Sequence, residues 1–195
     1  MGIVAWEFVT LDGVMEAPET WQLSTGLFDE AMGKAAFDLL IGTDALLLGR
    51  VTYELFAEAW PSMTDEDGFA DRMNGLPKLV ASTTLQEPLS WTNSTLIKGD
   101  MAKELARLTQ EPGQRISLVG SGALLNALMQ HDLIDEYEIW VHPIVTGSGK
   151  RLFADGPLTP VLKLVETRSF DTGVVALTYR PRGAEGAGTS GALDR

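Results

Sequence analysis

The sequence predicts an α/β protein with one central sheet, mainly parallel, that ends in an antiparallel C-terminal edge. Short, almost wholly apolar segments alternate with helical patterns from Ile3 to Gln130, which is the order of βα units. From Asp135 to Tyr179 the pattern changes to strands with apolar–polar alternation and no helices between them. The length of 195 residues, with 45% hydrophobic and 22% charged side chains, suits one globular domain.

Strand signals recur along the chain. In the first two thirds, short runs of apolar and β-branched residues bounded by turn residues predict strands over 3–10, 44–48, 78–82, 95–98 and 116–119. Longer alternating runs predict the last three strands over 135–144, 162–170 and 174–179. Asp171, Thr172 and Gly173 are expected to form the turn between the last two.

Helical signals fall between the early strands. Apolar residues at helical spacing predict helices over about 27–41, 51–60, 65–73, 100–108 and 123–130. Asp100 is the expected N-cap of the fourth, and acidic residues 65–67 mark the start of the third. Residues 11–15 predict a turn, and residues 16–25, with Pro18 and Trp21, a loop.

The first residues of the sequence do not have the pattern of a signal peptide. The N-terminus lacks a basic region, Glu7 interrupts its apolar run, and no segment approaches the ~20 apolar residues that span a bilayer. We therefore expect a soluble cytoplasmic protein with no membrane partner. Residues 1–182 are expected to form the single domain, and the Gly- and Ala-rich residues 183–195 a disordered tail.

Composition excludes several classes of function. The chain has no cysteine, which removes disulfides, thiol catalysis and metal centres with sulfur ligands. It has only two histidines, so a metal site is not expected. The formal net charge of -12 argues against binding to nucleic acid or anionic membranes, which reward clustered Lys and Arg. A small anionic ligand held by a few local groups stays possible.

Three predicted strand ends share small residues, hydroxyls or bare backbone N–H groups where a helix or loop begins. Glycine lets a phosphate approach the backbone, a helix N-terminus carries partial positive charge, and arginine adds a fork that suits phosphate. Together they predict one surface for a phosphorylated nucleotide, made of Gly49, Arg50, Thr52, Ser82, Thr83, Gly120, Ser121, Gly122, Ala123 and Leu124. Each segment alone also fits a plain tight turn or a strand break with a solvated arginine.

Two glycine-rich motifs resemble known fingerprints only superficially. In the segment that begins at Gly120, the third glycine of the dinucleotide fingerprint is Leu125, and the segment lies deep in the chain. Gly147–Lys150 lacks the first glycine of a P-loop, and Arg151 follows the lysine where Ser or Thr is needed. The second segment is expected to be a glycine-rich connection between strands.

Candidate catalytic and substrate-binding residues lie near the first loop. Asp12 follows the first strand and is the leading candidate for an acid or charge partner, with a plain Asp-Gly turn as the equal alternative. Asp29 and Glu30 are further candidates, or simply acids that favour a helix N-terminus. Trp21 either covers a flat ligand or anchors its loop. His131 is expected at the surface, and His142 is expected to be structural.

The chain resembles the dihydrofolate reductase-like superfamily, and within it the C-terminal reductase domain of the bifunctional riboflavin-biosynthesis deaminase/reductase. The matching segments, in order, are Thr10–Met15, Leu47–Glu54, Lys78–Ser82, Val119–Gly122 and His142–Gly149. The combination is specific, although no single segment is, and it covers nearly all of the chain up to Arg182.

The resemblance implies a sheet of about eight strands, NADPH as cofactor, and a homodimer formed through the C-terminal edge strands. By position, Arg50, Ser82 and Thr83 would face the 2′-phosphate. Gly49 and Thr52 would line the groove, and residues 120–124 would receive the pyrophosphate. Asp12 would lie near the nicotinamide. The expected function is reduction of a small, flat pterin-like or ribitylaminopyrimidine-like substrate.

Two departures leave the substrate open. Dihydrofolate reductases carry a Trp-Pro loop and an acid that holds the pterin, whereas Gln22 follows Trp21 here, and Asp29 or Glu30 would have to serve at altered spacing. The riboflavin enzymes carry an attached deaminase with metal-binding Cys and His residues, and this chain has no such part. The alternatives are a flavin-binding protein, or a non-catalytic small-molecule-binding protein, on the same fold.

Overall fold

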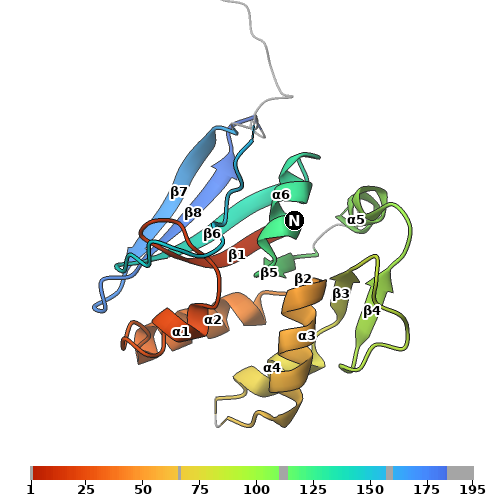
Figure 1. Ribbon diagram of the computed structural model, residues 1–195, viewed down its shortest axis with the longest axis horizontal. Coiled ribbons are helices and arrows are strands. Elements are labelled where there is room, and N and C mark those ends of the chain that lie inside the picture. The colour runs from red at the N-terminus through yellow and green to blue at the C-terminus, as the bar shows by residue number, and fades with distance from the viewer. Residues whose placement is uncertain (1, 66, 110–113, 157–159, 184–195) are drawn as a thin grey trace, which may run out of the picture.

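The computed structural model describes residues 2–65, 67–109, 114–156 and 160–183, which form an eight-stranded sheet in the order β4-β3-β2-β5-β1-β6-β8-β7 (Figure 1). The six strands from β4 to β6 are mutually parallel. Strand β8 pairs with β6 in the antiparallel sense, and β7 pairs with β8 in the same way. The strands are β1 (Ile3–Thr10), β2 (Ala45–Gly49), β3 (Lys78–Ala81), β4 (Ser94–Ile97), β5 (Ile116–Val119), β6 (Ile134–His142), β7 (Leu162–Ser169) and β8 (Val175–Pro181). The predicted fold class is confirmed.

Helices cover both faces of the sheet. Leu105 of α5 and Leu124, Leu125 and Leu128 of α6 pack with Ile3, Ala5 and Val9 of β1 on one face. The other face is covered by α2, α3 and α4. The helices are α1 (Pro18–Trp21), α2 (Glu30–Ile41), α3 (Arg50–Ala59), α4 (Phe69–Gly75), α5 (Met101–Thr109) and α6 (Gly122–Met129), with a 3-10 turn, η1, over Trp60–Ser62.

Two predicted elements differ in detail from the structure. The loop over 16–25 contains the short helix α1, which begins at Pro18, where a missing N–H costs a helix nothing. Helix α4 begins at Phe69, because Gly68 at φ 80° breaks the chain direction. The acid Asp65 still serves that helix, since its carboxylate accepts the backbone N–H of Ala70 at 2.6 Å.

The register of the parallel strands brings the predicted strand ends together. Gly49 of β2 pairs with Ala81 of β3, so Arg50 and Ser82 follow at adjacent points of the same edge. Leu47 pairs with Leu118 of β5, and Trp6 pairs with Val119, which places Gly120 between the end of β2 and Glu7 in the middle of β1. The carboxyl edge of β3, β2, β5 and β1 is therefore one continuous rim.

The C-terminal hairpin forms the far edge of the sheet. Residues 171–173 make the predicted turn, where Gly173 N–H bonds to Phe170 O at 2.9 Å. Most of β7 is exposed, including Leu164 and Val165. Residues 184–195 of the predicted tail lie outside the described residues. Among the helices described, none has the length and apolar character that a bilayer crossing requires.

Candidate active site

Two helix N-termini, one from each face of the sheet, meet at the carboxyl edge. Helix α3 begins directly after Gly49, and α6 begins directly after Ser121. The Ser121 hydroxyl joins them: its Oγ accepts the Gly49 N–H at 2.8 Å and donates to Thr52 Oγ1 at 2.7 Å. Two partially positive helix ends therefore face the same rim, as a site for a negatively charged group requires.

The turn before α6 is built for close approach. Gly120 has φ +59° and Ser121 has φ +66°, so two successive residues are left-handed. A Cβ at Gly120 would lie 3.0 Å from Thr52 Oγ1, and one at Gly122 would lie 2.5 Å from Met15 Sδ. Only glycine avoids both the strain and the contacts at Gly120. A non-glycine residue in this conformation, as at Ser121, is typical of functional sites.

The first N–H groups of α6 are not used by a cap. Ser121 occupies the N-cap position but its side chain makes no capping bond, because its hydroxyl is committed to Gly49 and Thr52. The first intrahelical bond of this end runs from Leu125 N–H to Ser121 O at 3.0 Å. Helix geometry leaves the preceding N–H groups, of Gly122, Ala123 and Leu124, without partners inside the helix. The Leu124 side chain itself is buried in the core.

Arg50 stands at the first position of α3, at the same rim. It forms an ion pair with Glu54 one turn later at 2.8 Å, and both side chains are about half exposed, at 46% and 47%. This pair uses one guanidinium nitrogen and leaves the rest of the fork open. Ser82, at the end of β3, holds its own turn, since its Oγ accepts the N–H groups of Thr84 and Leu85. Thr83 is exposed beside it.

A buried acid, Glu7, lies directly behind the glycine turn. It follows Trp6 on β1 as Gly120 follows Val119 on β5, and the Gly120 backbone N–H is the one backbone donor that acts on the pKa of its carboxyl group. Glu7 is 2% exposed, and its Oε1 has no hydrogen-bond partner among the described residues. Burial raises the pKa of Glu7 well above its usual value, and the bond from Gly120 only partly opposes this.

Asp12 ties the first loop to the loop that follows β6. Its carboxylate accepts the Thr10 hydroxyl at 2.6 Å and the backbone N–H groups of Gly147 and Thr146 at 2.9 and 3.3 Å. These donors, the Thr10 hydroxyl first, hold the pKa of Asp12 below its usual range. Asp12 is therefore a carboxylate at neutral pH, which suits a charge partner better than a proton donor.

Trp21 and its loop are anchored in the protein by His142. Trp21 is buried, donates its indole N–H to Glu16 O at 3.0 Å, and packs edge-on against His142 with ring centroids 5.0 Å apart. His142 is fully buried, and desolvation lowers its pKa. Its Nδ1–H donates to Trp140 O at 3.1 Å, so its Nε2 accepts the Gln22 amide at 3.2 Å. Trp21 thus has the anchoring role that was one of its two alternatives.

The other two candidate acids lie at the start of α2. Asp29 is the N-cap of the helix and accepts the Met32 N–H at 2.8 Å. Glu30 is the first residue of the helix and is exposed. The structure thus gives Asp29 a capping contact. Both acids lie far from the Gly120 turn in the sequence.

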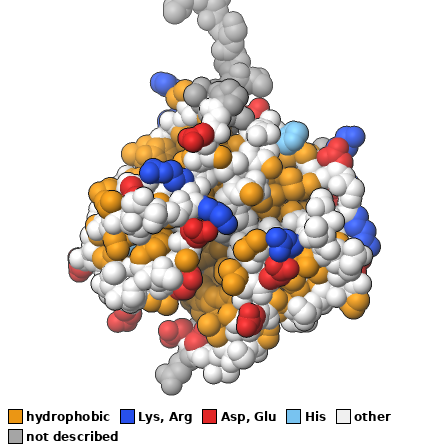
Figure 2. Space-filling model, viewed as in Figure 1, with side chains coloured by type: hydrophobic (Ala, Val, Ile, Leu, Met, Phe, Trp, Pro, Cys, Tyr) orange, Lys and Arg blue, Asp and Glu red, His pale blue; other side chains and the backbone are white. Residues whose placement is uncertain are grey.

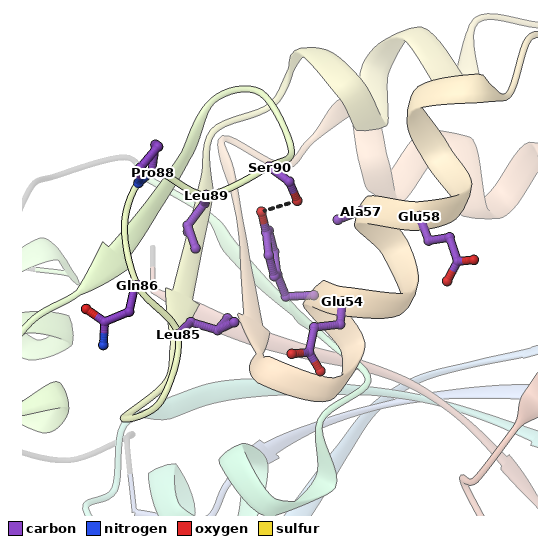
Figure 3. A pocket seen from close by; sticks show the side chains of 9 residues that line it. Glu54, Ala57, Glu58, Leu85, Gln86, Pro88, Leu89 and Ser90 are labelled. Carbon is purple, nitrogen blue, oxygen red and sulfur yellow. Dashed lines mark hydrogen bonds between the residues drawn. The ribbon is translucent and has the colours of Figure 1, made fainter.

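Two hollows adjoin α3. Figure 2 shows a depression between α2 and α3 whose floor is hydrophobic and whose rim carries acidic side chains. A separate cavity of about 370 Å³ lies between α3 and residues 85–90. Figure 3 shows Leu85 and Leu89 on the side of that loop that faces α3, and Tyr53 of α3 reaches Ser90 Oγ at 3.4 Å. This second cavity shares Glu54 with the Arg50 ion pair.

Sequence reasoning found the rim but missed Glu7 and the role of Ser121. Glu7 was visible as the single charge in a strand whose other residues are apolar or hydroxyl-bearing, and such a residue in a central strand must be buried. The Ser121 hydroxyl bonds to Thr52 and to Gly49, which precede it by 69 and 72 positions, so no local sequence pattern could show these contacts.

A mainly parallel sheet whose polar rim lies at the carboxyl ends of its strands, with two helix N-termini at that rim, is an α/β architecture that binds ligands at this edge in other proteins. Comparison with solved structures identifies the fold as dihydrofolate reductase-like. A putative riboflavin biosynthesis protein from Shewanella sp. PV-4 matches with a TM-score of 0.73 and 20% identity, over 93% of this chain and 99% of that one.

Two further structures extend the comparison. The deaminase/5-amino-6-(5-phosphoribosylamino)uracil reductase of Thermotoga maritima gives a TM-score of 0.60 at 16% identity, and 92% of this chain covers 56% of that one. Dihydrofolate reductase from Enterococcus faecalis, complexed with NADP(H), gives 0.54 at 11% identity, over 93% and 96% of the two chains.

The chain belongs to the RibD C-terminal domain family, whose sequence pattern matches residues 3–176. The uncharacterized protein YyaP of Bacillus subtilis (strain 168) is 32% identical over 178 residues, which is 90% of this chain and 92% of that protein. The family and the reductases among the solved structures support a reductase-type function on this fold.

Proposed function

We propose that the protein is an NADPH-dependent reductase of a small, flat heterocycle. The observation that carries the proposal is the convergence of the α3 and α6 N-termini with Arg50 at one rim. That combination fits a dinucleotide with a pyrophosphate and a third phosphate. The solved dihydrofolate reductase complex, which holds NADP(H) on the same fold, supports the same cofactor class.

Each group at the rim has a part in holding the cofactor. The N–H groups of Gly122, Ala123 and Leu124 would bind the pyrophosphate, and Gly49 and Thr52 would line its groove. Arg50 would bind the 2′-phosphate with the guanidinium nitrogens that Glu54 leaves open, assisted by Ser82 and Thr83. When bound, the nicotinamide supplies the hydride, and the protein's contribution is orientation and exclusion of water.

The hollow between α2 and α3 is the proposed substrate site. Its hydrophobic floor suits the face of a planar ring, and its acidic rim suits ring nitrogens that donate hydrogen bonds (Figure 2). Asp12 would act as a charge partner close to the nicotinamide and would hold the two loops of the site together. Trp21, fixed by His142, would form the inner wall on that side.

Fluorescence titration with NADPH and NADH tests the cofactor assignment. The Arg50→Ala variant should lose about 1.5–3 kcal/mol of NADPH affinity, roughly 10- to 150-fold, because a charge-assisted contact to phosphate is lost. NADH, which lacks that phosphate, should change by less than about 3-fold. The matched control is Lys34→Ala, which removes the cation of an exposed i,i+4 pair on α2. Equal losses for both cofactors in Arg50→Ala would remove Arg50 from the site.

Turnover tests the role of Asp12. The Asp12→Asn variant keeps one acceptor oxygen but puts an amide opposite the backbone N–H groups that its carboxylate now binds. We expect NADPH affinity to stay within about 3-fold of the parent while turnover falls by about tenfold or more. The assay follows NADPH oxidation with a panel of pterins and ribitylaminopyrimidines. Unchanged turnover on an identified substrate would leave Asp12 as a loop residue alone.

We also propose a homodimer formed through the C-terminal edge. Strand β7 is one of the two edge strands of the described sheet, and Val161, Leu164 and Val165 are exposed in and beside it. Exposed edges with apolar side chains favour pairing with a second copy. Light scattering should give a molar mass twice that of the chain. The double variant Leu164→Lys, Val165→Lys should have the mass of a single chain. A monomeric parent protein would rule the dimer out.

A further inference from the structure

Glu7 is a buried acid with too few partners to be charged. Its side chain is 2% exposed, its Oε1 has no partner among the described residues, and the one backbone donor that acts on the pKa of its carboxyl group is the Gly120 N–H. A buried carboxylate with one donor and a bare oxygen is costly, whereas a neutral carboxylic acid is much less so. Burial acts in the same direction on the pKa of Glu7.

Because of its position, the charge state of Glu7 affects the electrostatic potential at the N-terminus of α6. The carboxyl group bonds to the residue that starts the left-handed turn, and the turn aims the free N–H groups of α6 at the rim. An ionised Glu7 would place a negative charge directly behind the site for an anion. A neutral Glu7 accepts the Gly120 N–H and leaves the positive potential of the helix end intact.

We propose that Glu7 is a positioning residue of the nucleotide site: it holds the Gly120–Gly122 turn from behind and does so as an uncharged carboxylic acid. This inference rests on the proposed function for the identity of the ligand, although any pyrophosphate-containing anion would show the same dependence. Glu7 does not touch the ligand, and it acts through Gly120.

The other titratable groups around Glu7 are few. Strand β5 and helix α6 contain none, and β6 presents Tyr137 on the same face, where burial raises its pKa to about 12. Beyond the turn, Arg151 donates to Asp12 O, and Lys150 pairs with Glu16 at 3.3 Å on the surface. No charged side chain among the described residues bonds to the Glu7 carboxyl group.

Binding of NADPH and of inorganic pyrophosphate to the full chain tests the proposal with three variants. Glu7→Gln keeps a neutral acceptor for Gly120 and should bind both ligands within about 3-fold of the parent at pH 7, while Glu7→Leu should weaken both by about tenfold or more. Glu138→Gln is the matched control: it changes another buried carboxyl, on the opposite face of the sheet, and should leave both affinities unchanged.

A direct readout of protonation separates this role from mere stability. Isotope-edited infrared spectroscopy of the ligand-free parent should show the carbonyl stretch of a protonated carboxylic acid at pH 7, absent from Glu7→Gln. As pH rises and that band disappears, NADPH affinity of the parent should fall, while that of Glu7→Gln should not. Both comparisons hold the ligand and every other titrating group constant.

The outcomes are distinct. Absence of the band at pH 7, or equal affinities in Glu7→Leu and the parent, overturns the proposal and leaves the reductase assignment standing. Pyrophosphate binding that depends on Glu7, without NADPH binding, supports the proposal and overturns the cofactor assignment. If the parent binds neither ligand, both are overturned. Circular dichroism and the unfolding midpoint establish that Glu7→Leu is folded, and Glu7→Gln keeps the test decisive if it is not.

Discussion

Two buried carboxyl groups, on opposite faces of adjacent strands, have opposite surroundings. Glu7 of β1 has one backbone donor and a bare oxygen. Glu138 of β6, 8% exposed, accepts the Trp140 indole N–H at 2.9 Å on one oxygen and the Thr178 hydroxyl at 2.6 Å on the other. The strands pair in parallel, with Trp6 opposite Glu138 and Glu7 opposite Ile139.

The difference teaches where the chain keeps polar groups for a ligand. Around Glu138 each donor and acceptor is matched, as in a region whose task is to hold the sheet together. Around Glu7 the carboxyl oxygen and the first N–H groups of α6 are both incompletely matched, at the rim where the proposed ligand binds. Polar groups without a full set of hydrogen-bond partners, rather than charge alone, distinguish the site from the rest of the sheet.

The largest effect should be a pH dependence that separates Glu7→Gln from the parent. In the folded protein Glu7 keeps its proton well above pH 4.5, whereas the unfolded chain loses it near that value. The stability that the neutral acid allows is complete at acid pH and is lost as pH rises toward the folded pKa, at up to about 1.4 kcal/mol per pH unit. In urea unfolding, the free energy of unfolding of Glu7→Gln should therefore increase relative to that of the parent as pH rises from acid to neutral.

Parallel curves for the two proteins would contradict a neutral Glu7. A curve for Glu138→Gln that runs with the parent through the same range would confirm that the effect belongs to Glu7.

Next, Glu138→Gln should destabilise the protein by about 1–3 kcal/mol at neutral pH. The amide can accept only one of the two donors and turns its NH₂ toward the other, so one buried donor loses its partner. The urea midpoint measures the loss. An unchanged midpoint would mean that Glu138 is no better satisfied than Glu7, and the contrast between the two regions would disappear.

The turn itself gives a somewhat smaller effect. Gly120→Ala should cost about 1–2 kcal/mol from left-handed strain, plus the cost of a Cβ 3.0 Å from Thr52 Oγ1, and should weaken NADPH. Gly13→Ala is the control, because Gly13 has φ +83° and nothing lies within 4 Å of its added Cβ. Both should lose stability, and only Gly120→Ala should lose NADPH affinity. Equal binding by the two variants would place the ligand elsewhere.

The smallest effect concerns a buried cation at the amino end of β3. Lys78 is fully buried, donates to Asn74 O at 2.6 Å, and lies 4.1 Å from the centre of the Trp91 ring. Desolvation lowers its pKa from 10.5 to about 8. As pH rises above 8, Lys78 loses its proton in the folded state before it does so in the unfolded chain. The free energy of unfolding of the parent should therefore rise relative to that of Lys78→Met over this range. Unfolding midpoints that stay equally spaced would show that Lys78 titrates normally.

Sequence patterns predicted the fold well because strands and helices depend on local periodicity. The five parallel segments before residue 120, the turn at 171–173 and the order of helices all follow from short-range spacing, and each is present in the structure. The rim residues were predictable for the same reason: parallel strands in one sheet must end at a common edge, so Gly49, Ser82 and Gly120 had to come together.

The environments of the site residues depend on contacts across the chain, and no local pattern contains them. Asp12 accepts not only the nearby Thr10 hydroxyl but also the backbone N–H groups of Thr146 and Gly147, more than 130 positions away, and together these donors lower its pKa. Glu7 owes its state to burial between β5 and β6. Arg50 is the exception, because its pairing with Glu54 at i,i+4 is visible in the sequence.

The central place of β1 has a consequence for synthesis of the chain. Ile3 pairs with Ile116 on one side and Ile134 on the other, so the earliest strand of this sheet to be synthesised is among the last to find its neighbours. Until then its apolar residues have no sheet to join and are open to misassociation. Fragments that end before residue 142 should accumulate as aggregates or be degraded, and folding should be slow, since its decisive pairings join distant parts of the chain.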